Sequence, residues 1–535
     1  MADDPGYVFV AGPSGLHILP NGSLVSPEKY VARYSRGGEV PKKRADDLRS
    51  ETERDRGRLG YSPFLRRLAG VTQVISPDLS SSRMHSRASH SHKVALVARE
   101  LSELIARKAL IETQISDVIA AYGGLDIAAC EAAGLAHDLG HPPFGHAGEQ
   151  ELDRQLVAAG VTEGFEGNAQ TFRIVSRLDA RRLDREGLDL TNVTLAAILK
   201  YSFFRSGHVP PELVQPSADA DHAAGSAPGD IKTEADNSAT EHTSKFGAYA
   251  ADKDAFIRSR AAILGTDFAV SEQQTIEASI MDLADDIAYA IHDLEDFLSA
   301  GVINFANVGD GIEKAFKSGF DHGKLSEKAA LSDPFIREAI KLRDRYEGYF
   351  DDEKFKVALG AVFLFTQTAI STDDSDGLAS SALKEELSDR VSRYFASVKI
   401  DADGAYPGGP LVYLSPEMWH DIQVLKMITR QYLVSTPRMG MIQRSQTQAI
   451  RVLFKGLADW LVSTPDQNSL PASLQDALIR VGHPELPKKK KHLTADHYRA
   501  ICDYICGMSD AQALTHSLWI SGREVPGMSV VVEAG

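Results

Sequence analysis

The residue types best suited to chemistry stand together in one short stretch of this chain. His137 and Asp138 end an apolar segment, and Gly140 follows them. His141 and His146 bring the number of histidines to three within ten residues. Neighbouring helix positions differ in direction by about 100°, so His137 and Asp138 can converge on one ion at a helix end. Imidazole and carboxylate together suit magnesium or a divalent first-row metal, so the stretch predicts a metal site rather than a histidine-rich turn.

A further imidazole ligand is available upstream. The candidates are His85, His90 and His92, and their spacing alone does not choose between them. His90 opens a predicted helix that continues through Leu104, so it can supply an imidazole from a helix terminus. Arg87, which lies three residues before His90, is expected to contact a phosphate group.

A carboxylate ligand is expected from a predicted helix over residues 273–297. Its polar residues share one face and its apolar residues the opposite face. The polar face consists of Asp282, Asp285, Asp286, Tyr289, Asp293 and Asp296. A solvated acidic surface is the alternative interpretation. So many like charges on one face are unfavourable without a cation, so this face is expected to turn inward toward the metal.

The elements that must position these groups are predicted to be mainly α-helical. Helical periodicity dominates from about Phe64 onward, and strand-like alternation is rare. Residues 119–137 are rich in alanine and predict one buried helix, which ends before Gly140 and Pro142-Pro143. Further helices are predicted at residues 335–350, 354–368, 380–398, 416–432, 443–461 and 495–507.

Two regions differ from this helical pattern. Residues 1–40 are punctuated by glycine and proline and predict a loose N-terminal arm with a small hairpin. Residues 206–250 contain few large apolar side chains and predict a flexible insertion. The main domain is therefore expected to span residues 41–520, with a short tail at 521–535.

The overall composition limits the class of protein. The 535 residues are 43% hydrophobic, which is enough for a sizeable core, and there are only three cysteines. The start of the chain lacks a secretory signal and no apolar run is long enough for a membrane span, so a reducing cytoplasm is expected. The net charge of −16 argues against nucleic acid as the main partner. It still permits a small anion in a local basic pocket.

The stretch 137–149, HDLGHPPFGHAGE, resembles the HD-domain phosphohydrolases, and in particular their dGTPase branch. Other segments resemble motifs of the same family in the same order. These segments are residues 61–74, 166–170, 199–201, 285–293 and 503–510. The resemblance runs from about residue 51 to residue 514. It implies a helical HD-domain phosphohydrolase fold with additional C-terminal helices.

The resemblance also implies roles for individual residues. It selects His90 and Asp285 from the alternatives above, and the implied metal ligands are His90, His137, Asp138 and Asp285. The ion would be Mg²⁺ or Mn²⁺, with other first-row metals possible. His146 is implied to be the acid–base residue, with Glu149 as its partner. The implied substrate-binding residues are Gln73, Arg87, His141, Asn168, Lys200, Tyr201, Tyr289 and Asp293. Among them, Arg87, Lys200 and Tyr201 would bind phosphates, and Tyr289 and Asp293 would read the sugar 3′-hydroxyl.

The activity implied by the resemblance is hydrolysis of deoxynucleoside triphosphates to a deoxynucleoside and inorganic triphosphate. A homo-oligomer, either a hexamer or a tetramer, and secondary binding of single-stranded DNA are further implications. Two alternatives stay open. One is an HD phosphohydrolase that acts on a nucleoside monophosphate or signalling nucleotide, and the other is a non-enzymatic nucleotide sensor or single-stranded nucleic-acid binder. His92 and Lys93 replace the family's usual leucine and glutamate. Because the insertion closely follows Lys200-Tyr201, the nucleotide preference stays open too.

Overall fold

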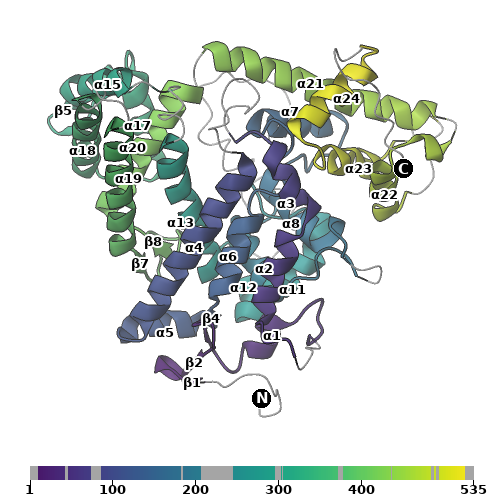
Figure 1. Ribbon diagram of the computed structural model, residues 1–535, viewed down its shortest axis with the longest axis horizontal. Coiled ribbons are helices and arrows are strands. Elements are labelled where there is room, and N and C mark those ends of the chain that lie inside the picture. The colour runs from purple at the N-terminus through teal and green to yellow at the C-terminus, as the bar shows by residue number, and fades with distance from the viewer. Residues whose placement is uncertain are drawn as a thin grey trace, which may run out of the picture.

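Two helices that cross at very close range form the centre of the molecule. They are α4 (Arg87–Ala109) and α6 (Ile127–Ala136), and every described residue of α6 except Glu131 is buried. A Cβ atom on Gly134 would lie 2.6 Å from the Cα atom of Ala95, so a larger residue could not occupy this crossing. A third helix, α13 (Ile276–Ala288), packs against both (Figure 1). The start of α4 and the end of α6 thereby meet beside one face of α13.

The computed structural model confirms the predicted all-α class. It describes residues 10–41, 46–73, 86–181, 185–205, 245–295, 303, 305–371, 378–434, 437–464, 466–483, 487, 489 and 493–523. The remaining helices of the central part are α1 (Tyr30–Tyr34), α2 (Glu51–Gly60), α3 (Pro63–Arg67), α5 (Thr113–Ala121), α8 (Gly167–Arg173), α9 (Asn192–Ile198), α11 (Lys253–Leu264) and α12 (Thr266–Ala269). Short 3-10 turns are Pro13–Gly15, Leu68–Gly70, Ala250–Asp252 and Gln467–Ser469.

The prediction of one helix over residues 119–137 is wrong. The segment contains the end of α5, the strand β4 (Gly124–Leu125) and then α6. Gly123 and Gly124 have φ angles of 78° and 129°, which interrupt a right-handed helix. A Cβ atom on Gly124 would lie 2.5 Å from the carbonyl oxygen of Leu24, so the neighbouring strand can pair only with glycine here.

The prediction of a loose N-terminal arm is wrong for residues 10–40. Their strands are β1 (Val10–Ala11), β2 (His17–Ile18) and β3 (Leu24–Val25), which form an antiparallel sheet in the order β1-β2-β3-β4. The small hairpin expected there is present as β2-β3. Leu16 and Leu24 are buried in the same core as α4 and α13, which explains why this segment is held in place.

The C-terminal helices form two groups on opposite sides of the centre (Figure 1). One group contains α15 (Phe305–Ser318), α16 (Glu327–Ala330), α17 (Pro334–Arg345), α18 (Asp352–Ser371), α19 (Leu378–Ser397) and α20 (Pro416–Thr429), with the two-stranded sheets β5 (Phe320–Asp321)–β6 (Lys324–Leu325) and β7 (Lys399–Ile400)–β8 (Val412–Tyr413). The other group contains α7 (His146–Ala158), α21 (Pro437–Ser463), α22 (Ala472–Arg480), α23 (Ala495–Ile505) and α24 (Asp510–Ile520). The helices predicted between residues 335 and 507 are all present, with ends shifted by a few residues.

The predicted insertion lies mostly outside the described residues. Its last part, residues 245–250, belongs to the packed structure, because Phe246 and Tyr249 are buried against α8. The expected boundary at residue 250 is therefore wrong, and the packed chain resumes by Lys245. Of the expected C-terminal tail, only residues 521–523 are described.

A fully buried ion pair fastens the N-terminal segment to the central helices. Arg33 of α1 donates a hydrogen bond to Glu277 of α13, and both side chains are buried. The same carboxylate accepts from the backbone N–H of Asp126, which begins α6 (3.1 Å). Burial alone would lower the pKa of Arg33, but Glu277 and its neighbours outweigh that effect and raise it.

We expect Glu277→Ala to destabilise the packing of the N-terminal segment on the central helices strongly, because it leaves the Arg33 charge buried without its partner. The free energy of unfolding should fall by about 3–5 kcal/mol. Backbone hydrogen exchange in residues 10–41 should accelerate accordingly. Asp47→Ala, which breaks an exposed pair with Arg49, is the control and should change stability by less than about 1 kcal/mol. Equal protection of residues 10–41 in both variants would contradict this account.

Candidate metal centre and active site

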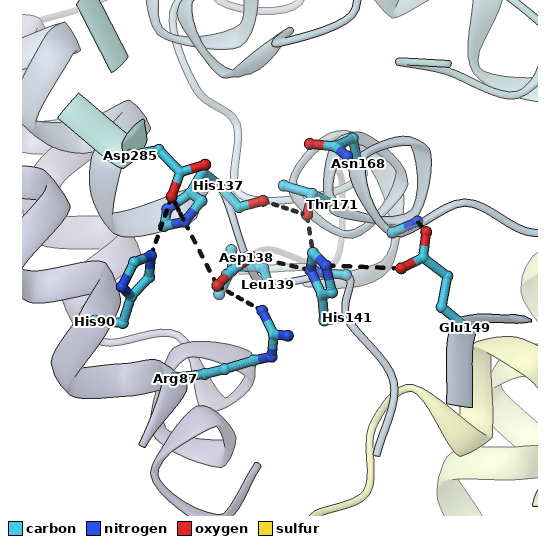
Figure 2. Close-up of polar contacts among 12 residues, drawn as sticks. Arg87, His90, His137, Asp138, Leu139, His141, Glu149, Asn168, Thr171 and Asp285 are labelled. Atoms are coloured by element: carbon cyan, nitrogen blue, oxygen red, sulfur yellow. Dashed lines mark hydrogen bonds and ion pairs between the residues drawn. The ribbon is translucent and has the colours of Figure 1, made fainter. Parts of the chain in front are cut away.

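Four of the predicted metal ligands converge where α4, α6 and α13 meet (Figure 2). The Nε2 atom of His90 lies 3.1 Å from Oδ1 of Asp285, and Nε2 of His137 lies 3.6 Å from the same oxygen. Oδ2 of Asp138 lies 3.5 Å from Nε2 of His137. The three residues His90, His137 and Asp138 are buried, and their ligand atoms lie within 4.8 Å of one another.

The hydrogen bonding of His137 fits an ion at this point. Its Nδ1 atom lies 2.8 Å from the carbonyl oxygen of Gly134, which can only accept, so Nδ1 carries the proton. In the neutral ring, Nε2 then has a free lone pair. Within the described part of the chain this buried Nε2 atom has no hydrogen-bond partner. A lone pair that faces two carboxylate oxygens without a proton between them is the arrangement that a cation would satisfy.

The second histidine is oriented by a further carboxylate. Nδ1 of His90 lies 3.4 Å from Oδ1 of the buried Asp293, while Nε2 faces Asp285. Burial disfavours the protonated ring, but the charge of Asp293 and the contacts with both carboxylates outweigh it and raise the pKa of His90 to about 10. Asp293 ends a π-turn (η8, Tyr289–Asp293) that continues α13. A carboxylate behind a ligating imidazole is a common support of metal sites.

Two cations offset the carboxylates of the centre. Nη1 of Arg87 donates to Asp138 (2.7 Å), and Nζ of Lys200 donates to Asp285 (2.8 Å). Burial by itself would raise the pKa of both carboxyl groups. The positive charges of Arg87 and Lys200, respectively, instead hold the pKa of Asp138 and Asp285 well below the usual range. Both side chains are therefore ionised and able to bind a metal.

The geometry distinguishes between the alternatives that spacing left open. His92 is exposed, whereas His90 is buried at the centre, and His85 lies outside the described residues. Asp286 turns away from the centre and pairs with Lys426 of α20 (2.8 Å). Asp282 pairs with Lys200. Among the described residues of the acidic face, the half-buried Asp282, Asp285 and Asp286 thus divide among the metal centre and two lysines.

A second group of titratable side chains adjoins the metal centre (Figure 2). His141 lies between the two groups, with Nδ1 3.0 Å from Oδ1 of Asp138 and Nε2 3.8 Å from Oε2 of Glu149. Nδ1 of His146 lies 3.1 Å from the same Glu149 oxygen. Burial and the nearby charge of Arg87 lower the pKa of His141 to about 4. His141 is therefore a neutral link between a metal ligand and the His146–Glu149 pair.

His146 is presented on an unusual turn. Phe144 and Gly145, which precede it, have φ angles of 67° and 56°, and His146 is then the first residue of α7. Its side chain is 70% exposed although Glu149 is buried. A reactant could therefore reach the His146 ring, while the Glu149 carboxylate orients that ring through its Nδ1 atom.

Lys245 is a site residue that the sequence analysis missed. Its Nζ atom lies 2.9 Å from Oε1 of Glu149 and 3.1 Å from Oε1 of Glu166. Burial opposes the ionisation of Glu149, but Lys245 and the hydrogen bond with His146 hold its pKa well below the usual range. The sequence offered one weak indication of this residue. Lys245 stands beside Phe246, where large apolar residues return near the end of the predicted insertion.

The remaining predicted substrate residues lie around these two groups. Nε2 of Gln73 lies 3.5 Å from Oδ2 of Asp293, beside the metal centre. Asn168 is the second residue of α8. Its side-chain amide donates to Glu166 (2.8 Å), which also pairs with Lys245. Tyr201 is half-buried next to Lys200, and burial raises its pKa to about 12. Tyr289 is half-buried at the start of the π-turn, one turn of helix beyond Asp285.

Glycine and threonine close the turn between the two groups. Thr171 of α8 donates to the carbonyl of His137 (3.1 Å) and accepts from the N–H of Gly140 (2.8 Å). A Cβ atom on Gly140 would lie 2.2 Å from backbone atoms of Gly167 and Thr171. Only glycine therefore permits α8 to pack against the turn that carries the ligands.

Comparison with known families agrees with this geometry. Residues 87–290 match the HD domain, and residues 412–517 match the phosphohydrolase-associated domain. A deoxyguanosinetriphosphate triphosphohydrolase-like protein of Corynebacterium efficiens is 31% identical over 424 residues, which cover 76% of this chain and 79% of the relative. The chain belongs to this HD-domain family.

Other members are similar over almost the whole length. A deoxyguanosinetriphosphate triphosphohydrolase-like protein of Streptomyces coelicolor is 29% identical over 517 residues, covering 92% of this chain and 96% of the relative. One from Mesorhizobium japonicum, designated protein 2, is 29% identical over 508 residues, covering 89% and 94%. The chain is thus an HD-domain phosphohydrolase with groups suited to a metal. Within its described residues, every helix is too short or too polar to cross a bilayer.

We expect neighbouring aspartates of α13 to differ sharply in their effect on bound metal. Asp285→Ala removes an oxygen that faces both imidazoles and should lower the metal content of the purified protein about tenfold or more. Asp286→Ala removes only the partner of Lys426 and should leave the metal content unchanged. Elemental analysis after dialysis measures both, and circular dichroism checks the helical content. Equal metal content in the two variants would contradict the assignment of Asp285.

Proposed function

We propose that this protein hydrolyses deoxynucleoside triphosphates to a deoxynucleoside and inorganic triphosphate. The observation that carries the proposal is that two groups of titratable side chains adjoin each other and are connected by one residue. A set of metal ligands meets an exposed imidazole–carboxylate pair, His146–Glu149, and His141 links them. The relatives' names, which specify a deoxyguanosine triphosphate triphosphohydrolase-like protein, support the class of substrate.

His90, His137, Asp138 and Asp285 would hold a divalent ion. When bound, such an ion would polarise a phosphate oxygen and lower the pKa of a water molecule. The mixture of imidazole and carboxylate ligands suits Mn²⁺ and also permits Mg²⁺ or another first-row metal. Because Arg87 and Lys200 keep the two aspartates ionised, the site retains two anionic ligands for the ion near neutral pH.

His146 would move the proton of the reaction. Its Nδ1 atom faces Glu149, so its Nε2 atom is the one available to the reactant. As water attacks the α-phosphorus, the bond to the 5′-oxygen breaks and that oxygen needs a proton, which Nε2 of His146 can donate. Glu149 would stabilise the protonated ring and hold its orientation.

Three cations would bind the triphosphate. Arg87 and Lys200 lie beside the metal centre, and Lys245 lies beside the His146–Glu149 pair. Together with a bound divalent ion, these cations would attract a polyanion to a protein whose overall charge is −16. Tyr201 adjoins Lys200 and would donate a hydrogen bond to the same phosphates.

The sugar would lie at the opposite side of the metal centre. Gln73 and Asp293 contact each other there, and Tyr289 begins the same π-turn. An amide, a carboxylate and a phenol can together donate to and accept from a 3′-hydroxyl. Asn168 and His141 would contact the phosphate side of the substrate, next to Glu166 and Glu149.

The experiment that tests this function is product analysis with each of the four deoxynucleoside triphosphates, singly and in mixtures, with Mg²⁺ or Mn²⁺. We expect free triphosphate and deoxynucleoside in equal amounts by ion-exchange chromatography. Release of pyrophosphate with a monophosphate would overturn the site of cleavage. Hydrolysis restricted to nucleoside monophosphates, or nucleotide binding without any hydrolysis, would overturn the function itself.

His146→Ala should retain metal and nucleotide but lower kcat by a factor on the order of 10² or more, the scale of general acid–base catalysis. The loss should fall on kcat rather than KM, because the proton transfer matters in the transition state. His322→Ala, which removes an almost fully exposed histidine outside the site, is the control. If the His146 variant lost its metal, the residue would belong to the coordination shell instead.

A further inference from the structure

The C-terminal motif 503–510 reaches the active site through one buried carboxylate. Asp510, the first residue of α24, accepts a hydrogen bond from the backbone N–H of Phe144 at Oδ1 (2.7 Å). Its other oxygen accepts from the backbone N–H of Thr72 (3.0 Å) and from the Thr72 hydroxyl. These partners lie 366 and 438 residues away in the sequence. The carboxylate therefore joins three distant segments of the chain.

The Phe144 bond falls on the turn that presents His146. Phe144 has a φ angle of 67°, which is unfavourable for a residue with a side chain, and Gly145 continues the left-handed turn. Such a turn persists only where its surroundings hold it. The Phe144 ring is buried in a core cluster that includes residues of α7, α21, α22 and α23, and its N–H donates to Asp510. This hydrogen bond comes from the C-terminal part of the chain.

The hydrogen bonds from Thr72 to Asp510 also connect the turn 144–145 to Arg87, which lies beside the metal centre. The carbonyl of Thr72 accepts from Nε of Arg87 (3.0 Å), and Arg87 itself binds Asp138. A Cβ atom on Gly145 would lie 2.9 Å from Nη2 of Arg87, so the turn packs directly on that guanidinium. Asp510 thereby fixes the spacing between the His146 turn and the Arg87 side of the metal centre.

The residues around Asp510 pack closely, so the start of α24 has little room to move relative to the turn that carries the proposed metal ligands. Arg67 donates to the carbonyls of Met508 (2.9 Å), Leu139 (2.9 Å) and His141 (2.8 Å), so it ties the start of α24 to the metal-site turn. A Cβ atom on Gly70 would lie 2.9 Å from Cβ of Ser509, the residue that caps α24.

We propose that Asp510 is a positioning residue of the reaction: its carboxylate holds the turn 144–145 so that His146 faces the substrate beside the metal centre. The phosphohydrolase-associated domain, which includes Asp510, would thus complete the active site rather than merely adjoin it. This inference rests on the proposed function, because it acts through the acid–base role of His146.

Asp510→Asn tests the proposal with little change of volume. The amide has only one oxygen, so it cannot accept from both Phe144 and Thr72, and its NH₂ group would face a donor. We expect kcat to fall on the order of tenfold to a hundredfold, the usual effect of a small misplacement in an active site. KM should change by less than about threefold, and metal content should be retained. Asp476→Asn on α22, an exposed aspartate of the same C-terminal region, is the control.

A double-mutant cycle with His146→Ala separates positioning from a general structural role. If Asp510 acts through His146, Asp510→Asn should lower kcat by less than about twofold when His146 is already alanine, because the two effects are coupled. Thr72→Val, which removes only the hydroxyl donor, is a second variant for the case that Asp510→Asn fails to fold. It should lower kcat about threefold or more, and again only when His146 is present.

Two results would overturn the inference while the proposed function stands. One is a normal kcat for Asp510→Asn alongside a large loss for His146→Ala. The other is the same fold loss from Asp510→Asn with and without His146, which would indicate a general structural role. An unchanged kcat in His146→Ala would instead overturn the acid–base assignment on which the inference rests.

Discussion

The structure depends on one electrostatic constraint, which is that several carboxylates are held close together away from water. Asp138, Asp285 and Asp293 converge on two buried imidazoles, and isolated charges are very costly to bury. Arg87 and Lys200 offset part of this charge, and a divalent cation between the imidazoles and carboxylates would offset the rest. The elements around the centre supply these charged and polar groups. His90 comes from α4, His137 and Asp138 directly follow α6, Asp285 comes from α13, and Asp293 comes from the π-turn that continues α13.

The need to balance buried charge also connects the metal centre with the group of His141, His146 and Glu149. Asp138 contacts both Arg87 and His141, and His141 continues the polar contacts to Glu149. Glu149 in turn is shared between His146 and Lys245, so positive and negative groups alternate across the site. In the proposed reaction, the His146–Glu149 pair would lie beyond the proposed metal ligands, where it could reach a leaving oxygen without competing for the ion.

Much of the fold class and part of the site could be predicted from the sequence, because these features are local. The helical class is confirmed, and the group His137-Asp138 with its histidine-rich turn was apparent from residue types alone. The choice of His90 over its neighbours needed the family resemblance, since one helix turn carries several histidines. The break at Gly123-Gly124 was missed because it depends on pairing with Leu24. Lys245 and the contacts of Asp510, which lies in a segment that resembles the family's C-terminal motif, were unpredictable for the same reason, because their partners lie at least 79 residues away.

The central claim is that one divalent ion binds between His90, His137, Asp138 and Asp285, rather than at the neighbouring group of His141, His146 and Glu149. Crystals grown with Mn²⁺ and measured at the manganese absorption edge test this directly by anomalous scattering. The account predicts one strong peak within about 2.0–2.3 Å of the two imidazole Nε2 atoms and of both aspartates. A peak coordinated by His141 and His146 instead, or strong anomalous density only outside both groups at saturating Mn²⁺, would contradict it.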